Sequence, residues 1–226
     1  MTKNKLRKFS ELKTFSNVLQ RDKVNREARE GVLGYQENIK KKLLQFIESD
    51  EVIIELACGR GDYTIGLAQE FPNKKVIGID IQGERIWYGA KYALENNLDN
   101  VLFLRIYIDD LLEYFPQHCI NEIWITFPDP FPKKRHTKKR LTFEKFLKMY
   151  QQVLKPNGKV TLKTDDQSLF EYSKESIIEF GGKILQINDD IYQNREDNPL
   201  LYIQTHYEKK HLAAGRTIKY LQFSFT

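Results

Sequence analysis

Two short segments of the sequence combine residue types whose spacing could support chemistry. In residues 53–62, an apolar run passes into the small residues of an E-x-A-x-G-x-G turn. In residues 126–141, three prolines stand around Asp129, and a run of lysines and arginines follows them. Small residues let a backbone approach a ligand closely, a fixed carboxylate can stabilise a nearby cationic group, and clustered cations bind phosphates. The two segments together indicate a site where a small ligand meets a polyanion.

The first segment is typical of a site for a nucleoside-containing cofactor. An apolar run over residues 52–56 precedes the turn, and the next apolar run ends at Asp80, whose carboxylate can accept hydrogen bonds from ribose hydroxyls. A dinucleotide site would need glycine at three positions of a GxGxxG turn, and Ala57 and Asp62 stand at two of them. Asp62 would also place negative charge where a helix N-terminus receives pyrophosphate. NAD is therefore disfavoured, and the Gly-Lys-Ser/Thr sequence of a P-loop is missing.

The second segment predicts a stiff acidic corner beside a phosphate-binding strip. Three prolines in five residues deny the backbone regular helix and sheet pairing, so we expect the Asp129 side chain to be held in one direction and buried beside the cofactor. Six cations then occupy eight positions, which exceeds the net charge of +5 of the whole chain. They are Lys133, Lys134, Arg135, Lys138, Lys139 and Arg140. Positive charge this concentrated favours nucleic acid as the partner.

Alternating strands and helices must position both segments. Strand-like apolar runs cover residues 52–56, 75–80, 101–108, 122–127, 159–164 and 183–188. Helical spacing covers residues 35–49, 62–70, 82–96, 142–154 and 166–180, with a short stretch near 110–115. Such alternation predicts an α/β fold with a doubly wound, mostly parallel sheet and helices on both faces. We expect residues 200–226 to add a late hairpin or an edge strand.

Length and composition exclude several classes of protein. A chain of 226 residues with 41% hydrophobic content suits one domain, and no apolar run approaches the roughly 18 residues of a membrane-spanning helix. Residues 1–34 are predicted to form a basic arm, flexible or partly helical, outside the domain of residues 35–226, and they lack the apolar block of a secretory signal. Cys58 and Cys119 are too few for a disulfide framework or a zinc site. We therefore expect a cytoplasmic protein without a metal or a membrane partner.

Several motifs resemble those of a known family. The turn with its downstream Asp80 resembles motif I of class I S-adenosylmethionine-dependent methyltransferases. Residues 127–141 resemble the signature FPDPWPKKRHxKRRL of the bacterial tRNA (guanine-N7-)-methyltransferase family almost without interruption. Residues 162–165 resemble its FKTD motif, and residues 205–210 resemble its TEYExK motif. The resemblance covers roughly residues 35–225.

The resemblance implies a fold, a reaction and a set of site residues. It implies a Rossmann-like, seven-stranded sheet and a monomer or homodimer that methylates N7 of guanine(46) in the variable loop of tRNA. S-adenosyl-L-methionine would be the donor and S-adenosyl-L-homocysteine the product. The residues implied to bind the cofactor are Glu55, Gly59, Gly61, Asp80, Asp109 and Asp129, of which Asp129 is also the catalytic candidate. Those implied to contact the substrate nucleotide are Lys133, Asp165, Thr205, His206, Tyr207 and Glu208, and those implied to contact RNA are Arg135, His136, Thr137, Lys138, Lys139 and Arg140.

Four positions depart from the family pattern. Phe131 stands in place of tryptophan, Ala57 in place of the first glycine, Asp80 in place of a common glutamate, and His206 in place of an acid. Phenylalanine still offers an apolar ring, and aspartate only shortens the reach to the ribose. Alanine is tolerable at position 57 if its backbone keeps a negative φ, which an L residue adopts without strain.

Two other functions remain compatible with parts of the sequence. Asp129-Pro130-Phe131 resembles the (D/N)PP(F/Y) motif of methyltransferases that act on exocyclic amines, although the second consecutive proline is missing. The chain could also be a non-catalytic RNA-binding subunit that has kept the fold. The retention of Glu55, Asp80 and Asp129 argues against this second function, because a pure binding module needs no sulfonium pocket.

Overall fold

The computed structural model describes residues 3–20, 29–48 and 51–225. Their strands form one eight-stranded sheet in the order β1-β4-β3-β2-β5-β6-β8-β7. The strands are β1 (Val18–Gln20), β2 (Val52–Leu56), β3 (Lys75–Ile79), β4 (Val101–Arg105), β5 (Ile120–Thr126), β6 (Leu154–Thr164), β7 (Gly182–Asn188) and β8 (Lys219–Phe225). The pairs from β1 to β6 are parallel, and β8 runs antiparallel to both β6 and β7. The predicted doubly wound, mostly parallel sheet is therefore confirmed.

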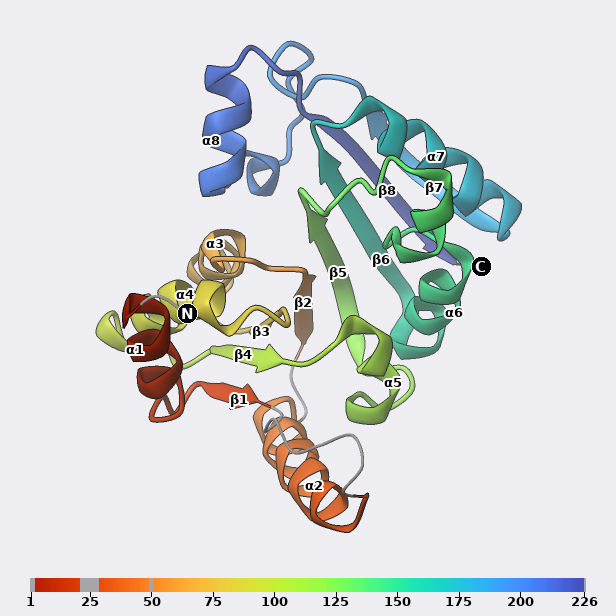
Figure 1. Cartoon of the computed structure of the whole chain (residues 1–226). Coiled ribbons are helices and arrows are strands. Elements are labelled where there is room, and N and C mark those ends of the chain that lie inside the picture. The colour runs from red at the N-terminus through yellow and green to blue at the C-terminus, as the bar shows by residue number, and fades with distance from the viewer. Residues whose placement is uncertain (1–2, 21–28, 49–50, 226) are drawn as a thin grey trace.

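Helices cover both faces of the sheet (Figure 1). The α-helices are α1 (Lys3–Leu12), α2 (Arg29–Phe46), α3 (Asp62–Glu70), α4 (Gly83–Glu95), α5 (Leu111–Tyr114), α6 (Glu144–Val153), α7 (Gln167–Glu179) and α8 (His206–Ala213). The short 3-10 helices are η1 (Ile108–Asp110), η2 (Lys134–Lys139) and η3 (Pro199–Tyr202). Buried side chains of α2, α5, α6 and α7 belong to one core cluster, and those of α1, α3 and α4 belong to the other.

Strand β2 illustrates why the interior strands could be predicted. All five of its residues are buried. Ile54 and Leu56 belong to one core cluster and Ile53 to the other, because successive side chains of a strand point to opposite faces. A parallel strand covered on both sides therefore appears in the sequence as a continuous apolar run. The observed bounds of β2 match the run at residues 52–56.

Both ends of the chain differ from the sequence prediction. Strand β1 pairs with β4 at one edge and raises the number of strands from the expected seven to eight. The arm was expected to lie outside the core, yet Leu12 of α1 is fully buried and Trp87 of α4 donates a hydrogen bond to Glu11 at 2.8 Å. Residues 21–28 of the predicted arm lie outside the described residues. Strand β8 is an interior strand, because β6 and β7 pair with its two sides.

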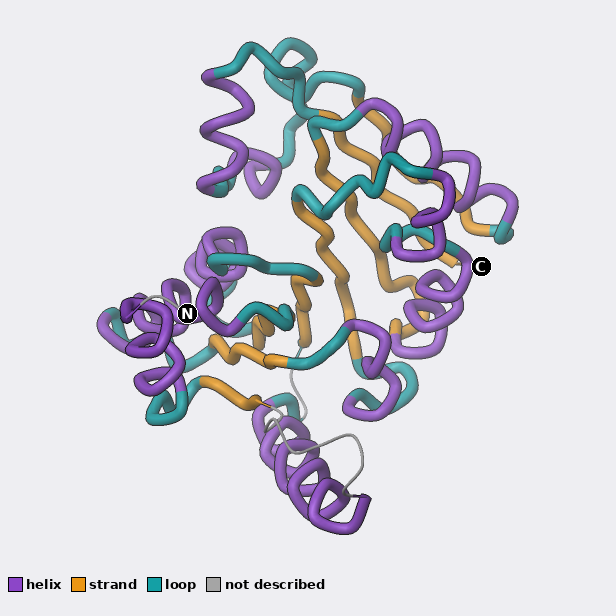
Figure 2. Tube along the Cα trace, in the orientation of Figure 1, coloured by secondary structure: helices purple, strands orange, loops and turns teal. Residues whose placement is uncertain are grey.

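The parallel strands carry the two chemically interesting segments to one edge of the sheet. The turn at residues 57–61 follows β2, Asp80 follows β3, the proline-rich loop follows β5, and Asp165 follows β6. Figure 2 shows the loops after β5 and β6 at the end of these strands that faces α8. Ligands of open α/β sheets bind outside the carboxyl ends of the strands, so this edge is the place to look for a site. Among the described helices, none has the length and apolarity needed to cross a bilayer.

Candidate active site at the carboxyl edge of the sheet

The turn after β2 is built from left-handed backbone. Gly59 and Gly61 have φ angles of +55° and +74°, and a Cβ atom on Gly61 would come within 2.6 Å of the Phe103 ring. Ala57 also has a positive φ of 57°, so the condition of a negative φ for a strain-free alanine at this position is not met. The chain must reverse sharply between β2 and α3, and it does so at Ala57 at a cost of roughly 1–2 kcal/mol for an L residue.

Asp80 ties this turn to the end of β3. The amide of Gly59 donates to Oδ2 of Asp80 at 2.9 Å, and the amide of Gln82 donates to Oδ1 at 2.8 Å. Asp80 is largely buried and still forms part of the wall of a cavity. Its carboxylate can therefore hold the turn and contact a ligand at the same time.

Glu55 lies beneath the turn, and its side chain is 1% exposed. Its Oε2 accepts hydrogen bonds from the amide of Thr64, at 2.8 Å, and from the Thr64 hydroxyl, while Oε1 accepts from the Thr126 hydroxyl. Burial raises the pKa of Glu55 to about 7, although these hydrogen bonds act in the opposite direction. Glu55 thus supports the turn from inside, and its direct contact with a cofactor stays a prediction.

Two adjoining cavities open at this edge. The large cavity, of about 760 Å³, extends from Asp80 and Asp109 to the proline-rich loop. The small cavity, of about 290 Å³, lies between the turn, the same loop and α8. Both cavities are lined by Ala57, Arg85, Phe127, Pro128 and Asp129. A ligand in one cavity is therefore separated from a ligand in the other only by this common wall.

The large cavity combines carboxylates with apolar side chains. Asp80 lies on its wall, and Asp109, which forms an ion pair with Lys145, also lines it. Besides the residues shared with the small cavity, its apolar lining residues are Ile81, Ile106, Ile108, Phe131, Leu141 and Phe146. Carboxylates for hydroxyl groups beside an apolar surface for a flat ring suit an adenosine group, and the volume lies in the usual range for ligand cavities. The residues present therefore fit a nucleoside cofactor.

The small cavity is more polar and has an aromatic side. The Asp165 side chain, 11% exposed, accepts from Nη1 of Arg216 at 2.5 Å and lies 3.2 Å from Nδ1 of His211. The Phe127 ring stacks on the His211 ring with 5.6 Å between centroids. Thr205 and Tyr207 of the predicted substrate set also line this cavity. The arrangement can hold a flat heterocycle whose N–H groups need acceptors.

Asp129 lies on the common wall, but it is not buried. Its side chain is exposed, and Oδ1 accepts from the amide of Phe131 at 3.1 Å. The expectation of a buried carboxylate was wrong because the loop leaves the sheet after Thr126 and its prolines keep it from pairing with a neighbouring strand. Phe127 and Phe131 both have positive φ, at 49° and 43°, so the corner is turned by strained backbone on both sides of Asp129.

Arg140 holds the proline-rich loop in place through its backbone carbonyl groups. It was assigned to the RNA strip, yet it is only 7% exposed. Its Nε donates to the carbonyl of Pro130 and its Nη2 to that of Phe131, both at 3.2 Å, and its guanidinium lies 4.4 Å from the centroid of the Tyr172 ring. The structure therefore gives Arg140 the place of a clamp on the loop, because buried carbonyl groups need donors.

The other cations of the strip remain near the surface. Lys133, Arg135 and Lys138 are exposed. Lys139 also lines the large cavity. The Thr137 hydroxyl donates to the carbonyl of Lys134, and the His136 ring meets the Phe131 ring edge-on at 6.3 Å. Lys133, expected at the substrate nucleotide, is not among the residues that line the small cavity.

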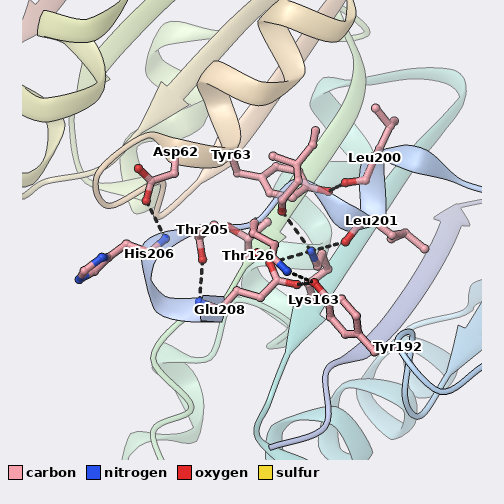
Figure 3. Close-up of polar contacts among 12 residues, drawn as sticks. Asp62, Tyr63, Thr126, Lys163, Tyr192, Leu200, Leu201, Thr205, His206 and Glu208 are labelled. Atoms are coloured by element: carbon pink, nitrogen blue, oxygen red, sulfur yellow. Dashed lines mark hydrogen bonds and ion pairs between the residues drawn. The ribbon is translucent and has the colours of Figure 1, made fainter. Parts of the chain in front are cut away.

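The C-terminal motif is anchored by a buried ion pair (Figure 3). Nζ of Lys163 contacts Oε2 of Glu208 at 3.0 Å, and both side chains are fully buried. Tyr192 donates to the other carboxylate oxygen at 3.0 Å. Glu208 was expected to contact the substrate, but it does not line the small cavity, and Lys163 and Tyr192 contact both of its carboxylate oxygens. The hydroxyl of Thr205 caps α8 and accepts from the amide of Glu208. Burial lowers the pKa of Lys163, and the Glu208 charge opposes that shift.

Helix α8 is also tied to the start of α3. The amide of His206 donates to Oδ2 of Asp62 at 2.8 Å, as Figure 3 shows. Sequence reasoning missed Asp62, Lys163 and Tyr192 as supports of the site. Lys163 stood inside a motif, but its partner is 45 residues away along the chain and is found only in the fold.

The sequence is closely similar to that of named proteins. Residues 49–221 match a protein family described as "Putative methyltransferase". The tRNA (guanine-N(7)-)-methyltransferase of Christiangramia forsetii is 43% identical over 98% of this chain and 98% of its own length. The protein of the same name from Porphyromonas gingivalis is 45% identical over 79% of this chain and 73% of its own length.

Solved structures show a similar fold at low sequence identity. An antibiotic-related methyltransferase superposes with a TM-score of 0.62 and 20% identity, covering 83% of this chain and 94% of its own. The 16S rRNA methyltransferase KamB superposes with a TM-score of 0.61 and 14% identity, covering 84% and 94%. The architecture is therefore that of known methyltransferases.

Proposed function

The chain belongs to the tRNA (guanine-N(7)-)-methyltransferase family, and on that premise we propose that it methylates N7 of guanine(46) in the variable loop of tRNA, with S-adenosylmethionine as donor. One observation carries the proposal beyond the family: Asp129 and its neighbours form the common wall of two cavities of different character. A donor on one side and a base on the other would meet at this wall. Modification of tRNA would take place in the cytoplasm.

The large cavity is the proposed site of S-adenosylmethionine. Asp80 would accept hydrogen bonds from the ribose hydroxyls, and the apolar residues near Asp109 would cover the adenine. The methionine end would meet the turn where the two cavities adjoin, because Ala57 lines both cavities and Gly59 lines the small one. The cofactor supplies an electrophilic methyl group on a sulfonium, and carboxylates around a cation are electrostatically favourable.

The small cavity is the proposed site of the guanine base. Asp165 could accept from the N–H edge of guanine, because a carboxylate has about four lone-pair positions and Arg216 and His211 contact only Oδ2. Phe127 offers a ring surface on the wall shared with the large cavity. Tyr207 and Thr205 would complete the lining.

The reaction would depend mainly on positioning. Guanine N7 has a free lone pair at neutral pH, so the protein need not remove a proton before the attack. Holding the base in line with the methyl group makes the displacement effectively intramolecular, which can lower a barrier by roughly 7–11 kcal/mol. The purine becomes cationic as the methyl group arrives, and the Asp129 carboxylate favours that charge. Because Asp129 is exposed in the free protein, bound RNA would have to exclude water from the corner.

The test is to map the methyl group on a natural substrate. Unmodified tRNA is incubated with the protein and labelled S-adenosylmethionine, then reduced and cleaved with aniline, which breaks the chain at 7-methylguanine. We expect one break, in the variable loop, and no label in tRNA that carries adenine at position 46. Label on an exocyclic amine would instead favour the amine methyltransferase. No label, and no heat on titration with S-adenosylmethionine, would favour a binding module.

A further inference from the structure

A third cavity opens where α1, α4, the turn and α8 meet. This basic cavity, of about 320 Å³, is lined by Lys5, Lys8, Arg60, Arg85, Tyr88 and Lys210, among others. It shares Arg60, Arg85 and Tyr207 with the small cavity, so the two adjoin. None of residues 133–140 lines it. The basic cavity is therefore a second concentration of positive charge, separate from the strip.

The charges of the basic cavity are poorly compensated. Glu84 is the carboxylate among its lining residues, and it is paired with Lys5 at 2.8 Å. Within the described part of the chain, Lys8, Arg60, Arg85 and Lys210 form no ion pair with a carboxylate. Positive charge that the protein does not neutralise itself is complementary to a polyanion.

An aromatic ring stands among these cations. Tyr88 is 37% exposed, and the Arg60 guanidinium lies 4.1 Å from its ring centroid. The Lys8 ammonium lies 3.9 Å from the same centroid and donates to the Tyr88 hydroxyl at 2.5 Å. Nε of Arg60 is buried and has no hydrogen-bond partner among the described residues, so this guanidinium keeps unused donor capacity at the junction of the two cavities. Cations held on an exposed tyrosine are a typical surface for nucleic acid.

We propose that the basic cavity binds the phosphodiester backbone of the nucleotide that flanks the target guanosine. Arg60, Lys8 and Lys210 would contact the phosphate, and Tyr88 would lie against the sugar or the base of that nucleotide. This inference rests on the proposed function, because it takes the small cavity as the guanine site. The lining residues that the two cavities share, Arg60, Arg85 and Tyr207, support it, because they place a nucleotide in the small cavity beside one in the basic cavity.

Binding of tRNA at several salt concentrations tests the proposal. The variants Lys8→Ala and Lys210→Ala remove cations from different helices, so a folding defect in one does not affect the other. The matched control is Lys183→Ala, an exposed lysine on β7. Removal of one phosphate-binding cation should reduce the slope of log affinity against log salt by about 0.7 and weaken binding about three- to tenfold. Affinity for S-adenosylmethionine should stay as in the wild type.

The outcomes separate this inference from the proposed function. Salt slopes of both variants equal to that of Lys183→Ala would overturn it. A loss of S-adenosylmethionine affinity with unchanged tRNA affinity would also overturn it, because the cavity would then serve the cofactor. If the wild type shows the expected salt dependence but methylates no guanine N7, the proposed function fails while the phosphate site stands.

Discussion

At the scale of single residues, the site depends on carboxylates in unlike surroundings. Glu55 is enclosed and hydrogen-bonded on both oxygens, Asp80 is largely buried at a cavity wall, and Asp129 is exposed. Their chemistry should differ accordingly, because burial disfavours the charged form of a carboxyl group and solvent screens an exposed charge. We therefore propose that Glu55 supports the turn, that Asp80 binds the donor and that Asp129 contacts the reacting base.

Substitution Asp129→Asn tests the role of the exposed corner. Asparagine keeps the shape and removes the charge that would face the methylated purine. We expect kcat to fall about 10- to 100-fold, with tRNA affinity changed less than about threefold. Single-turnover methylation and filter binding measure the two quantities. Asp99→Asn, on an exposed loop, is the control. If Asp129→Asn lowered kcat and tRNA affinity by the same factor, the proposed contact of Asp129 with the reacting base would be contradicted.

Glu55 should make stability depend on pH. Its folded pKa of about 7 lies above the ordinary value of 4.5, so the folded protein keeps a proton that the unfolded chain releases between these values. The free energy of unfolding should therefore fall as pH rises from about 4.5 to about 7. One pKa unit corresponds to about 1.4 kcal/mol, which makes the loss on the order of 3 kcal/mol.

Urea unfolding at several pH values measures this loss. Glu55→Gln cannot ionise, so its free energy of unfolding should not show this loss. The difference in unfolding free energy between the variant and the wild type should therefore shift in favour of the variant by about 2–3 kcal/mol as pH rises from about 4.5 to about 7. Glu179→Gln, at the exposed end of α7, should follow the wild type. Parallel profiles for Glu55→Gln and the wild type would show that Glu55 keeps its ordinary pKa.

At the scale of elements, two anchors fix the segments that line the small cavity. The buried pair of Lys163 and Glu208 holds α8 against β6, and Arg140 holds the loop after β5. Neither anchor faces the proposed ligands. Their effect on the reaction would pass through the position of Tyr207 and Asp129, so both are positioning groups.

Breaking the buried ion pair should cost more than removing it whole. Lys163→Met leaves the Glu208 charge buried alone, which should lower the free energy of unfolding by about 3–5 kcal/mol. Adding Glu208→Gln should recover part of that loss. Urea unfolding of the two single variants and the double variant gives the coupling, and Lys148→Met in the exposed pair with Glu144 should change stability by less than about 1 kcal/mol. Additive losses in the buried pair would argue against the anchor.

Arg140→Lys should separate positioning from RNA binding. Lysine keeps the charge but cannot donate to both loop carbonyls, so the corner should loosen and kcat should fall about 10- to 100-fold. The KM for tRNA should stay nearly constant. Lys138→Ala should do the reverse, weakening tRNA binding and reducing its salt slope by about 0.7–0.9. A reduced salt slope for tRNA binding by Arg140→Lys would instead show that Arg140 contacts the RNA.

At the scale of the whole molecule, the sequence predicted what depends on local pattern. The interior strands β2 to β6 and the helices between them appear as apolar runs and periodic spacing, and the motifs fall at their ends. Strand β1 has only three residues, and α8 has little apolar periodicity, so neither gives a pattern of its own. The burial of Glu208 and that of Arg140 depend on partners such as Lys163 and Tyr172, which lie far away along the chain, so residue types alone do not specify them. The exposure of Asp129 depends on the path that the proline-rich loop takes as it leaves the sheet.

The wall common to the large and small cavities links two binding events in one free-energy cycle. Both ligands would contact the residues of this wall, among them Ala57, Phe127, Pro128 and Asp129. A ligand in one cavity should therefore alter the affinity of the other cavity for its ligand. Cooperativity of this kind is reciprocal: the factor by which a bound methyl donor changes the dissociation constant of tRNA must equal the factor by which tRNA changes that of the donor. Because demethylated cofactor lacks the cationic sulfur, we expect a different factor for it, which would help the modified RNA to leave.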